Sequence, residues 1–160
     1  MTPAFTHCAM HVADLDRSIA FYDRYCGMTI VKEHGEGDSR VVWLASPGAE
    51  QSFVLVLLGG GPKRTQDEDD MTYYGFGVPA REDIDRIAER AKQDGLLHWT
   101  PRDYAPPTGY LCGVTDPTGY IIEFSYGQPL GPHAKDGLLH FPAIRTAQDL
   151  MVACAQLAYK

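Results

Sequence analysis

The sequence predicts an α+β fold of two βαβββ modules whose paired sheets form a cup. Two observations lead to this prediction. The order strand, helix, strand, strand, strand occurs twice along the chain, and a glycine follows each predicted helix. One such module alone would leave a sheet face uncovered, and pairing two modules encloses that face. Ligand sites favour junctions of this kind, so a small-molecule cavity is expected between the sheets.

The first module is expected over residues 5–58. Its first strand is predicted over the apolar segment 5–12. Asp14 is expected to cap a helix over residues 15–26, whose apolar residues recur at helical spacing and which Gly27 ends. Glycine-rich turns separate the three remaining strands, which are expected at residues 28–33, 40–45 and 52–58.

The pattern starts again after residues 59–70, which are rich in glycine and acidic residues and are expected to form a linker. The second module is expected over residues 71–127. Its helix is predicted over residues 81–94, and Gly95 ends it. Its strands are predicted near residues 71–78, 97–101, 110–114 and 120–126.

The two modules are expected to form a single domain over residues 1–127, followed by an irregular arm and a terminal helix over residues 128–160. Leu150, Cys154 and Leu157 lie on one stripe of that helix, and an exposed apolar stripe is unfavourable in water. The stripe can pack on the protein's own sheet or across a twofold axis. We favour a homodimer, because twofold dimers are the commonest oligomers.

Composition and charge exclude several classes of partner. The chain has 160 residues and a formal net charge of −7, which argues against nucleic acid and against an anionic membrane surface. No apolar run approaches the roughly 18 residues of a membrane span. The four cysteines form no CxxC pair, and no secretion signal is recognised at the N-terminus. The expected compartment is therefore the cytoplasm.

Three residues stand out as site candidates. Counting back five residues from Val12 reaches His7, and counting back five from Val78 reaches Tyr73, so the two modules present these side chains at equivalent positions. Glu123 lies in the apolar last strand, where a carboxylate is costly unless a metal, an arginine or solvent partners it. In a cup of paired sheets these three side chains are expected to converge.

The segment from Thr6 to Tyr22, with Cys26-Gly-Met28 after it, resembles the opening of the vicinal oxygen chelate superfamily. This group includes glyoxalase I, fosfomycin resistance proteins, extradiol dioxygenases and bleomycin resistance proteins. The segment Asp116-Pro-Thr-Gly-Tyr-Ile-Ile-Glu-Phe124 resembles its closing motif. The resemblance covers residues 5 to about 127, and it implies the same two-module fold for this chain.

The resemblance also implies roles. His7 and Glu123 match metal ligands of the family, whereas Tyr73 stands where several members have a further histidine, and no carboxylate occurs in the fourth strand. Histidine and carboxylate suit Fe(II), Mn(II), Zn(II) or Ni(II). Neutral tyrosine is a weak ligand because its pKa is near 10. Tyr73 is therefore a third ligand, a hydrogen-bond donor to substrate or a general acid.

Four further residues are expected to line the pocket: His11, Trp43, Tyr74 and Tyr110. The three aromatic residues are large and amphipathic, which suits a mostly apolar ligand wall. His11 lies four residues from His7 along a strand, roughly 13 Å away, which is too far for both to hold one metal ion. We expect His11 to line one end of the cavity.

Two kinds of function follow from the site. The first is a metal-assisted enzyme with lyase or dioxygenase type chemistry on an oxygen-bearing organic substrate. The alternative is a binding protein of the bleomycin resistance type, which sequesters a small molecule without chemistry. The missing third ligand favours the alternative, and the presence of both His7 and Glu123 weighs against it. Between them lies a metal-free enzyme that uses His7, Tyr73 and Glu123 for acid–base work.

Overall fold

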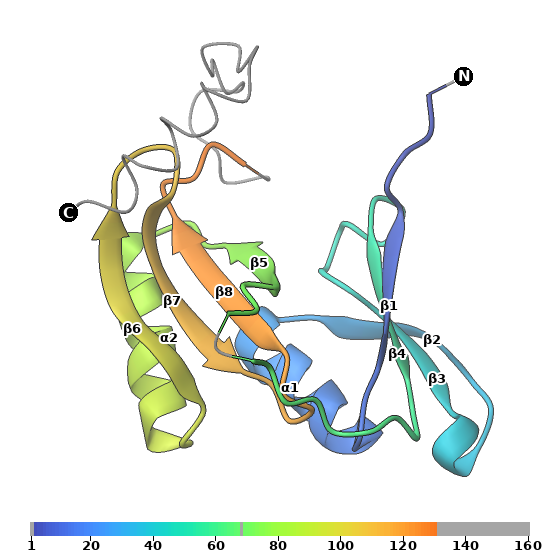
Figure 1. The fold of residues 1–160 in the computed structure, drawn as a ribbon. Coiled ribbons are helices and arrows are strands. Elements are labelled where there is room, and N and C mark those ends of the chain that lie inside the picture. Colours follow the sequence, from blue (N-terminus) through green and yellow to red (C-terminus); the bar gives the residue numbers. More distant parts are fainter. Residues whose placement is uncertain (1, 68, 131–160) are drawn as a thin grey trace. The chain divides into compact units, whose positions relative to one another are not determined.

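The computed structural model describes residues 2–67 and 69–130, and they form two four-stranded sheets with the same strand order (Figure 1). Counted within each module, that order is first, fourth, third, second strand. The predicted pair of βαβββ modules is therefore confirmed.

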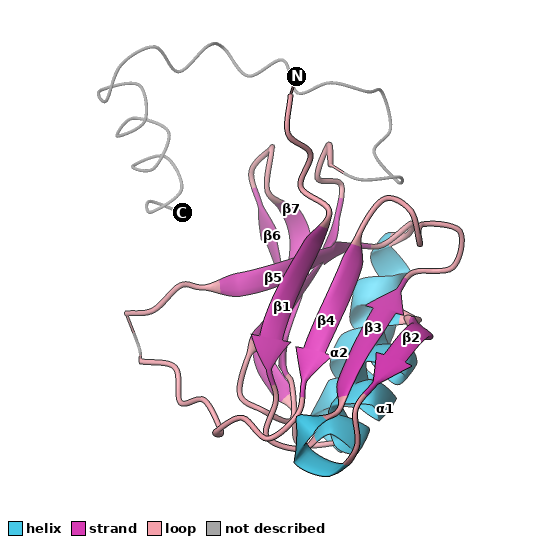
Figure 2. Ribbon diagram, turned by 90° about the vertical axis from the view of Figure 1, so that its right-hand side faces the viewer, coloured by secondary structure: helices cyan, strands magenta, loops and turns pink. Residues whose placement is uncertain are grey.

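The first sheet has the order β1-β4-β3-β2, which is easily followed in Figure 2. β1 is parallel to β4, and the other neighbouring pairs are antiparallel. Its strands are β1 (His7–His11), β2 (Thr29–His34), β3 (Val41–Ala45) and β4 (Val54–Leu58), and a short 3-10 helix η1 (Gly37–Ser39) joins β2 to β3.

Helix α1 (Leu15–Cys26) spans the residues that the sequence predicts. The Asp14 side chain accepts a hydrogen bond from the Arg17 backbone N–H at 3.0 Å, and so caps the first turn. Gly27 adopts a φ of 63°, a left-handed conformation that glycine adopts at little cost, and it ends the helix there.

The second sheet has the order β5-β8-β7-β6. Its elements are β5 (Tyr73–Gly77), α2 (Arg81–Gln93), β6 (Leu97–Tyr104), β7 (Gly109–Thr115) and β8 (Ile121–Tyr126). β6 extends beyond its predicted end at Pro101. The pairing register with β7 shifts between Trp99 and Arg102, and this irregularity accommodates a proline that has no N–H for the ladder.

The described chain divides into two compact units. Within the described residues, one unit consists of residues 2–67 and 69–74 together with Thr115–Ile122, and the other consists of Gly75–Val114 together with residues 123–130. The turn between β7 and β8 thus packs with the first unit, although the sequence places it in the second module.

A buried carboxylate holds this turn. Oδ1 of Asp116 accepts three backbone N–H groups, from Thr118, Gly119 and Tyr120, at 2.8–2.9 Å. Oδ2 of Asp116 accepts the hydroxyl of Tyr22 on α1 at 3.1 Å. The Thr118 hydroxyl accepts the N–H of Ala13, just before α1, at 3.2 Å. These bonds tie a turn late in the chain to the start of the first helix.

The segment between the modules is also fixed to this turn. The N–H of Arg64 donates to the Thr118 carbonyl at 2.7 Å. Gly119 has a φ of 112°, and a Cβ built there would lie 2.0 Å from the Arg64 carbonyl oxygen. Glycine is therefore required at position 119 both by its backbone conformation and by the close approach of the linker.

No helix in the described ranges has the length and apolar character needed to cross a membrane. The predicted terminal helix with Leu150, Cys154 and Leu157 lies outside the described residues. The predicted homodimer stays a prediction.

Removing the Tyr22 hydroxyl should loosen the buried turn. In Tyr22→Phe the Asp116 carboxylate stays buried and loses one of its hydrogen-bond donors, which costs about 1–3 kcal/mol of unfolding free energy. We expect the midpoint of thermal unfolding to fall by about 2–4 °C for each kcal/mol. The control is Tyr104→Phe at an exposed tyrosine. Equal midpoints for the two variants would contradict the structural role of Tyr22.

Candidate functional site

His7 and Tyr73 occupy equivalent places in the two modules: His7 is the first residue of β1, and Tyr73 is the first residue of β5. The His7 side chain is exposed, and its Nδ1 lies 3.0 Å from the hydroxyl of Thr6. That bond leaves Nε2 of the ring available to a ligand. Tyr73 is 44% exposed.

The next residue along each strand makes a structural contact. The Tyr74 hydroxyl and the Cys8 thiol are hydrogen-bonded, and the Tyr74 ring packs edge-on to Tyr120 at 5.8 Å between centroids. Burial, and then the neighbouring Cys8, raise the pKa of Tyr74 to about 12. Tyr74 is therefore neutral at physiological pH, and its place in a ligand pocket stays a prediction.

Alternation along β1 separates its side chains into two faces. Met10 is buried and its sulfur lies 3.6 Å from the Tyr22 hydroxyl, so Met10 faces α1. His7 and His11 therefore point away from α1, to the opposite face of the sheet. The register that pairs Ala9 with Val56, and Val56 with Trp43, extends this face to β3. Trp43 thus shares a sheet face with both histidines.

Glu123 is a buried carboxylate in the middle of β8, with only 4% of the residue exposed. Burial raises the pKa of Glu123 above its usual range, because an ionised carboxylate loses hydration there. A hydrogen bond opposes this effect: the side-chain amide of Gln128 donates to Oε1 at 3.2 Å. Among the described residues, this is the one hydrogen-bond donor to the carboxylate.

A glycine on the neighbouring strand leaves space beside this carboxylate. A Cβ built on Gly75 of β5 would lie 3.9 Å from Oε1 of Glu123, so the carboxylate rests against the Gly75 side of that strand. Side chains two residues apart in a strand project to the same face. The Tyr73 side chain therefore projects to the face of β5 to which a Cβ on Gly75 would project.

The sequence pattern places Gln128 in an irregular arm and does not indicate its contact with Glu123. Gly127 directly after β8 has a φ of 84°, a conformation that glycine adopts at little cost. Gly109 of β7 allows the end of β8 to pass closely, since a Cβ there would lie 2.3 Å from the Tyr126 carbonyl oxygen. The sequence signal that could have indicated this contact is Gly127 directly after the strand that carries Glu123, with the amide side chain of Gln128 next to it.

Tyr110 takes part in a different arrangement. Its hydroxyl donates to Asp85 of α2 at 2.6 Å, and the guanidinium carbon of Arg81 lies 3.5 Å from its ring centroid. Arg81 also forms two 2.6 Å bonds to Asp103 of β6. This network joins α2 to the two strands beneath it and explains Tyr110 as a packing residue on the helix side of the sheet.

Two of the predicted site residues carry potential metal ligands: His7 in the first unit has an imidazole nitrogen, and Glu123 in the second unit has a buried carboxylate. Both are common ligands of divalent transition metals. Within residues 2–67 and 69–130, no cluster of three or more His, Cys, Asp and Glu side chains could hold a metal ion.

A family model of the glyoxalase/bleomycin resistance protein/dioxygenase superfamily matches residues 4–124. The chain belongs to this superfamily. The resemblance seen in its first and last motifs is therefore confirmed, as is the two-module fold that it implies.

Two curated proteins are similar to this chain in sequence, and one solved structure is similar to it in fold. An uncharacterized protein of Pseudomonas aeruginosa is 48% identical over 135 residues, which cover 84% of this chain and 96% of that protein. A lactoylglutathione lyase of Salmonella typhimurium is 26% identical, over 78% of this chain and 93% of the enzyme. The solved structure of the fosfomycin resistance protein FosX from Listeria monocytogenes, complexed with Mn(II) and a dihydroxypropylphosphonic acid, is 17% identical with a TM-score of 0.64, and the match covers 80% of this chain and 95% of FosX.

Replacing Glu123 by an uncharged isostere should stabilise the metal-free protein at neutral pH. The folded-state pKa of Glu123 lies above its unfolded value, so ionisation destabilises the folded state as pH rises through the folded pKa. Glu123→Gln should match the wild type near pH 4, where Glu123 is protonated, and should unfold at a higher temperature at pH 7–8.

Thermal unfolding of chelator-treated protein across this pH range measures the effect. The exposed Glu36 provides the matched control, and Glu36→Gln should follow the wild type throughout. A Glu123→Gln variant less stable than the wild type at pH 8 would contradict the expected burial cost.

Proposed function

We propose that this protein is a small-molecule enzyme that uses a divalent metal ion held by His7 and Glu123, with Tyr73 at the third ligand position. The observation that carries the proposal is the Glu123 carboxylate, which is buried with a single hydrogen-bond donor among the described residues. A positively charged partner would offset the cost of its burial. The proposed substrate is an organic molecule with neighbouring oxygen atoms, and the reaction is of the lyase or dioxygenase type.

Each side chain has a defined part in this proposal. The metal would supply Lewis-acid polarisation of a substrate oxygen when bound. His7 would contribute Nε2, because Nδ1 is engaged with Thr6. Tyr73, which is partly exposed and whose hydroxyl can donate a hydrogen bond, would orient the substrate or deliver a proton to it. Two similar proteins support this class of function. A lactoylglutathione lyase is similar to this chain in sequence, and FosX, whose solved structure contains Mn(II), is similar to it in fold.

The second candidate is a protein that binds a small molecule without reacting with it. The specific observation in its favour is Tyr73, since a tyrosine at this position is a weaker metal ligand than histidine. The absence of a three-donor His, Cys, Asp and Glu cluster from the described part of the chain points the same way. The two candidates differ in whether the protein retains a metal ion.

Metal content decides between them. Protein purified without chelator should contain close to one equivalent of a divalent metal, and apo protein should bind Mn(II) or Ni(II). His7→Ala and Glu123→Gln should each weaken that binding at least about tenfold, because each removes a ligand. The controls are His98→Ala and Glu36→Gln, both at exposed positions. Unchanged affinity in both ligand variants would overturn the metal proposal and favour the binding protein.

The Gln128 amide should matter for the same binding. It holds one carboxylate oxygen of Glu123, and the loss of such an outer partner typically weakens metal binding about 10–100-fold. Gln128→Ala should therefore bind Mn(II) at least about tenfold more weakly than the wild type, and its apo form should unfold at a lower temperature, because the buried carboxylate loses its hydrogen-bond donor. The matched control is Gln93→Ala, since the Gln93 amide donates to Glu89 on the exposed face of α2 at 3.0 Å. Wild-type affinity in Gln128→Ala would show that Gln128 has no part in orienting Glu123.

A further inference from the structure

The face of the first sheet that points away from α1, which we call the open face, has an unusual charge pattern. It begins on β1 with His7 and His11, and the register carries it across the sheet. Ala9 pairs with Val56, Val56 with Trp43, and Trp43 with Lys32. The ammonium of Lys32 lies 5.5 Å from the centroid of the Trp43 ring, so Lys32 and Trp43 share this face.

A second row of pairs runs beside the first and ends on the same edge strand. His11 pairs with Leu58, Leu58 with Val41, and Val41 with His34 of β2. The ionisable residues of the open face are thus His7, His11, Lys32 and His34. Its other strand positions hold alanine, valine, leucine, threonine and tryptophan. None of the strand positions on this face is acidic, in a chain with 21 acidic and 14 basic residues.

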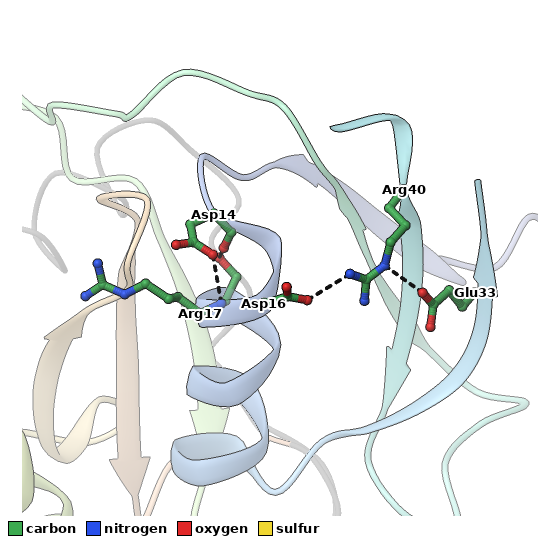
Figure 3. Close-up of polar contacts among 6 residues, drawn as sticks. Asp14, Asp16, Arg17, Glu33 and Arg40 are labelled. Carbon is green, nitrogen blue, oxygen red and sulfur yellow. Dashed lines mark hydrogen bonds and ion pairs between the residues drawn. The ribbon is translucent and has the colours of Figure 1, made fainter. Parts of the chain in front are cut away.

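The acidic residue of β2 points to the other side. Glu33 pairs with Val42, which is fully buried on the α1 side. Its carboxylate contacts the Arg40 guanidinium at 2.6 Å, and Arg40 also contacts Asp16 of α1 at 2.8 Å (Figure 3). The negative charge of β2 is therefore neutralised on the α1 side, whereas Lys32 remains on the open face.

We propose that the open face binds an elongated organic anion, with Lys32 pairing with the anionic group and Trp43 packing against the apolar part. This inference rests on the proposed function in taking the face that carries His7 as the substrate face. Trp43 lies two strands across and two residues along from His7, which is roughly 12 Å between backbone positions. A substrate with its reactive oxygens at His7 would thus carry its anionic group at the far end.

The geometry explains why lysine and tryptophan occur together here. Lys32 lies over an aromatic ring, where the cation is attracted by the ring face and stays on the open side of the strand. A carboxylate or phosphate that reaches Lys32 forms a charge-assisted hydrogen bond, and its apolar neighbour covers the indole. Lys32 and His34 on an edge strand would also hinder edge-to-edge pairing, a role that gives no preference for an anionic ligand.

Two probes of matched shape test the proposal on the full-length, metal-free protein: 3-phenylpropionate and the neutral 3-phenylpropanol. In NMR titrations the acid should bind about tenfold more tightly than the alcohol. Lys32→Gln should reduce this preference to about twofold or less. Trp43→Leu should weaken both probes, because both place a ring on the indole. Lys92→Gln, at an exposed lysine on α2, should retain the wild-type preference.

Several results would overturn the inference. Equal affinity for the two probes in the wild type, or an unchanged preference in Lys32→Gln, would do so. Light scattering that shows a dimer in the wild type but not in Lys32→Gln or Trp43→Leu would identify the face as an interface between copies instead.

The metal proposal and the anion proposal can be overturned independently of each other. A Lys32-dependent preference for the acid, together with full metal binding by His7→Ala and Glu123→Gln, would retain the anion face and overturn the metal proposal. Loss of metal binding in those two variants, together with equal affinity of the wild type for the acid and the alcohol, would retain the metal proposal and overturn the anion face.

Discussion

The arrangement of the first unit depends on the buried carboxylate of Asp116. It accepts three N–H groups of its own turn and the hydroxyl of Tyr22, so residues far apart in sequence are held by one side chain. Burial raises the pKa of Asp116, and the hydrogen bonds lower it in return. Because β8 begins at Ile121, directly after this turn, the same bonds fix where the strand that carries Glu123 starts.

Asp116 and Glu123 are both buried acids, yet their surroundings suit different purposes. Asp116 has four hydrogen-bond donors, which is what a structural carboxylate requires. Glu123 has one donor among the described residues, and Gly75 leaves space beside it. A buried carboxylate kept at a cost to stability is more readily explained by a ligand than by folding. This contrast, rather than burial alone, directs the functional proposal to Glu123.

The sequence predicted the fold well because its signals are local. Asp14 as a cap, Gly27 as a stop and the apolar periodicity between them predicted α1 to the residue. The equivalence of His7 and Tyr73 followed from counting along two similar strands, and both begin their strands. The polar surroundings of Glu123 could not be predicted in the same way, because the Gln128 contact depends on a turn at Gly127 and on close packing at Gly109.

The sign of the charge on the open face depends on one irregularity that alternation cannot predict. Ile30 pairs with Leu44, but Lys32 pairs with Trp43, so Val31 is an extra residue in β2. In a regular strand Lys32 would lie opposite Val42 and point to the α1 side, and Glu33 would point to the open face. The bulge exchanges these directions: the lysine joins Trp43 on the open face, and Glu33 turns to Arg40. A one-residue shift in an edge strand thus places a lysine rather than a glutamate on this face, and the composition of the strand stays the same.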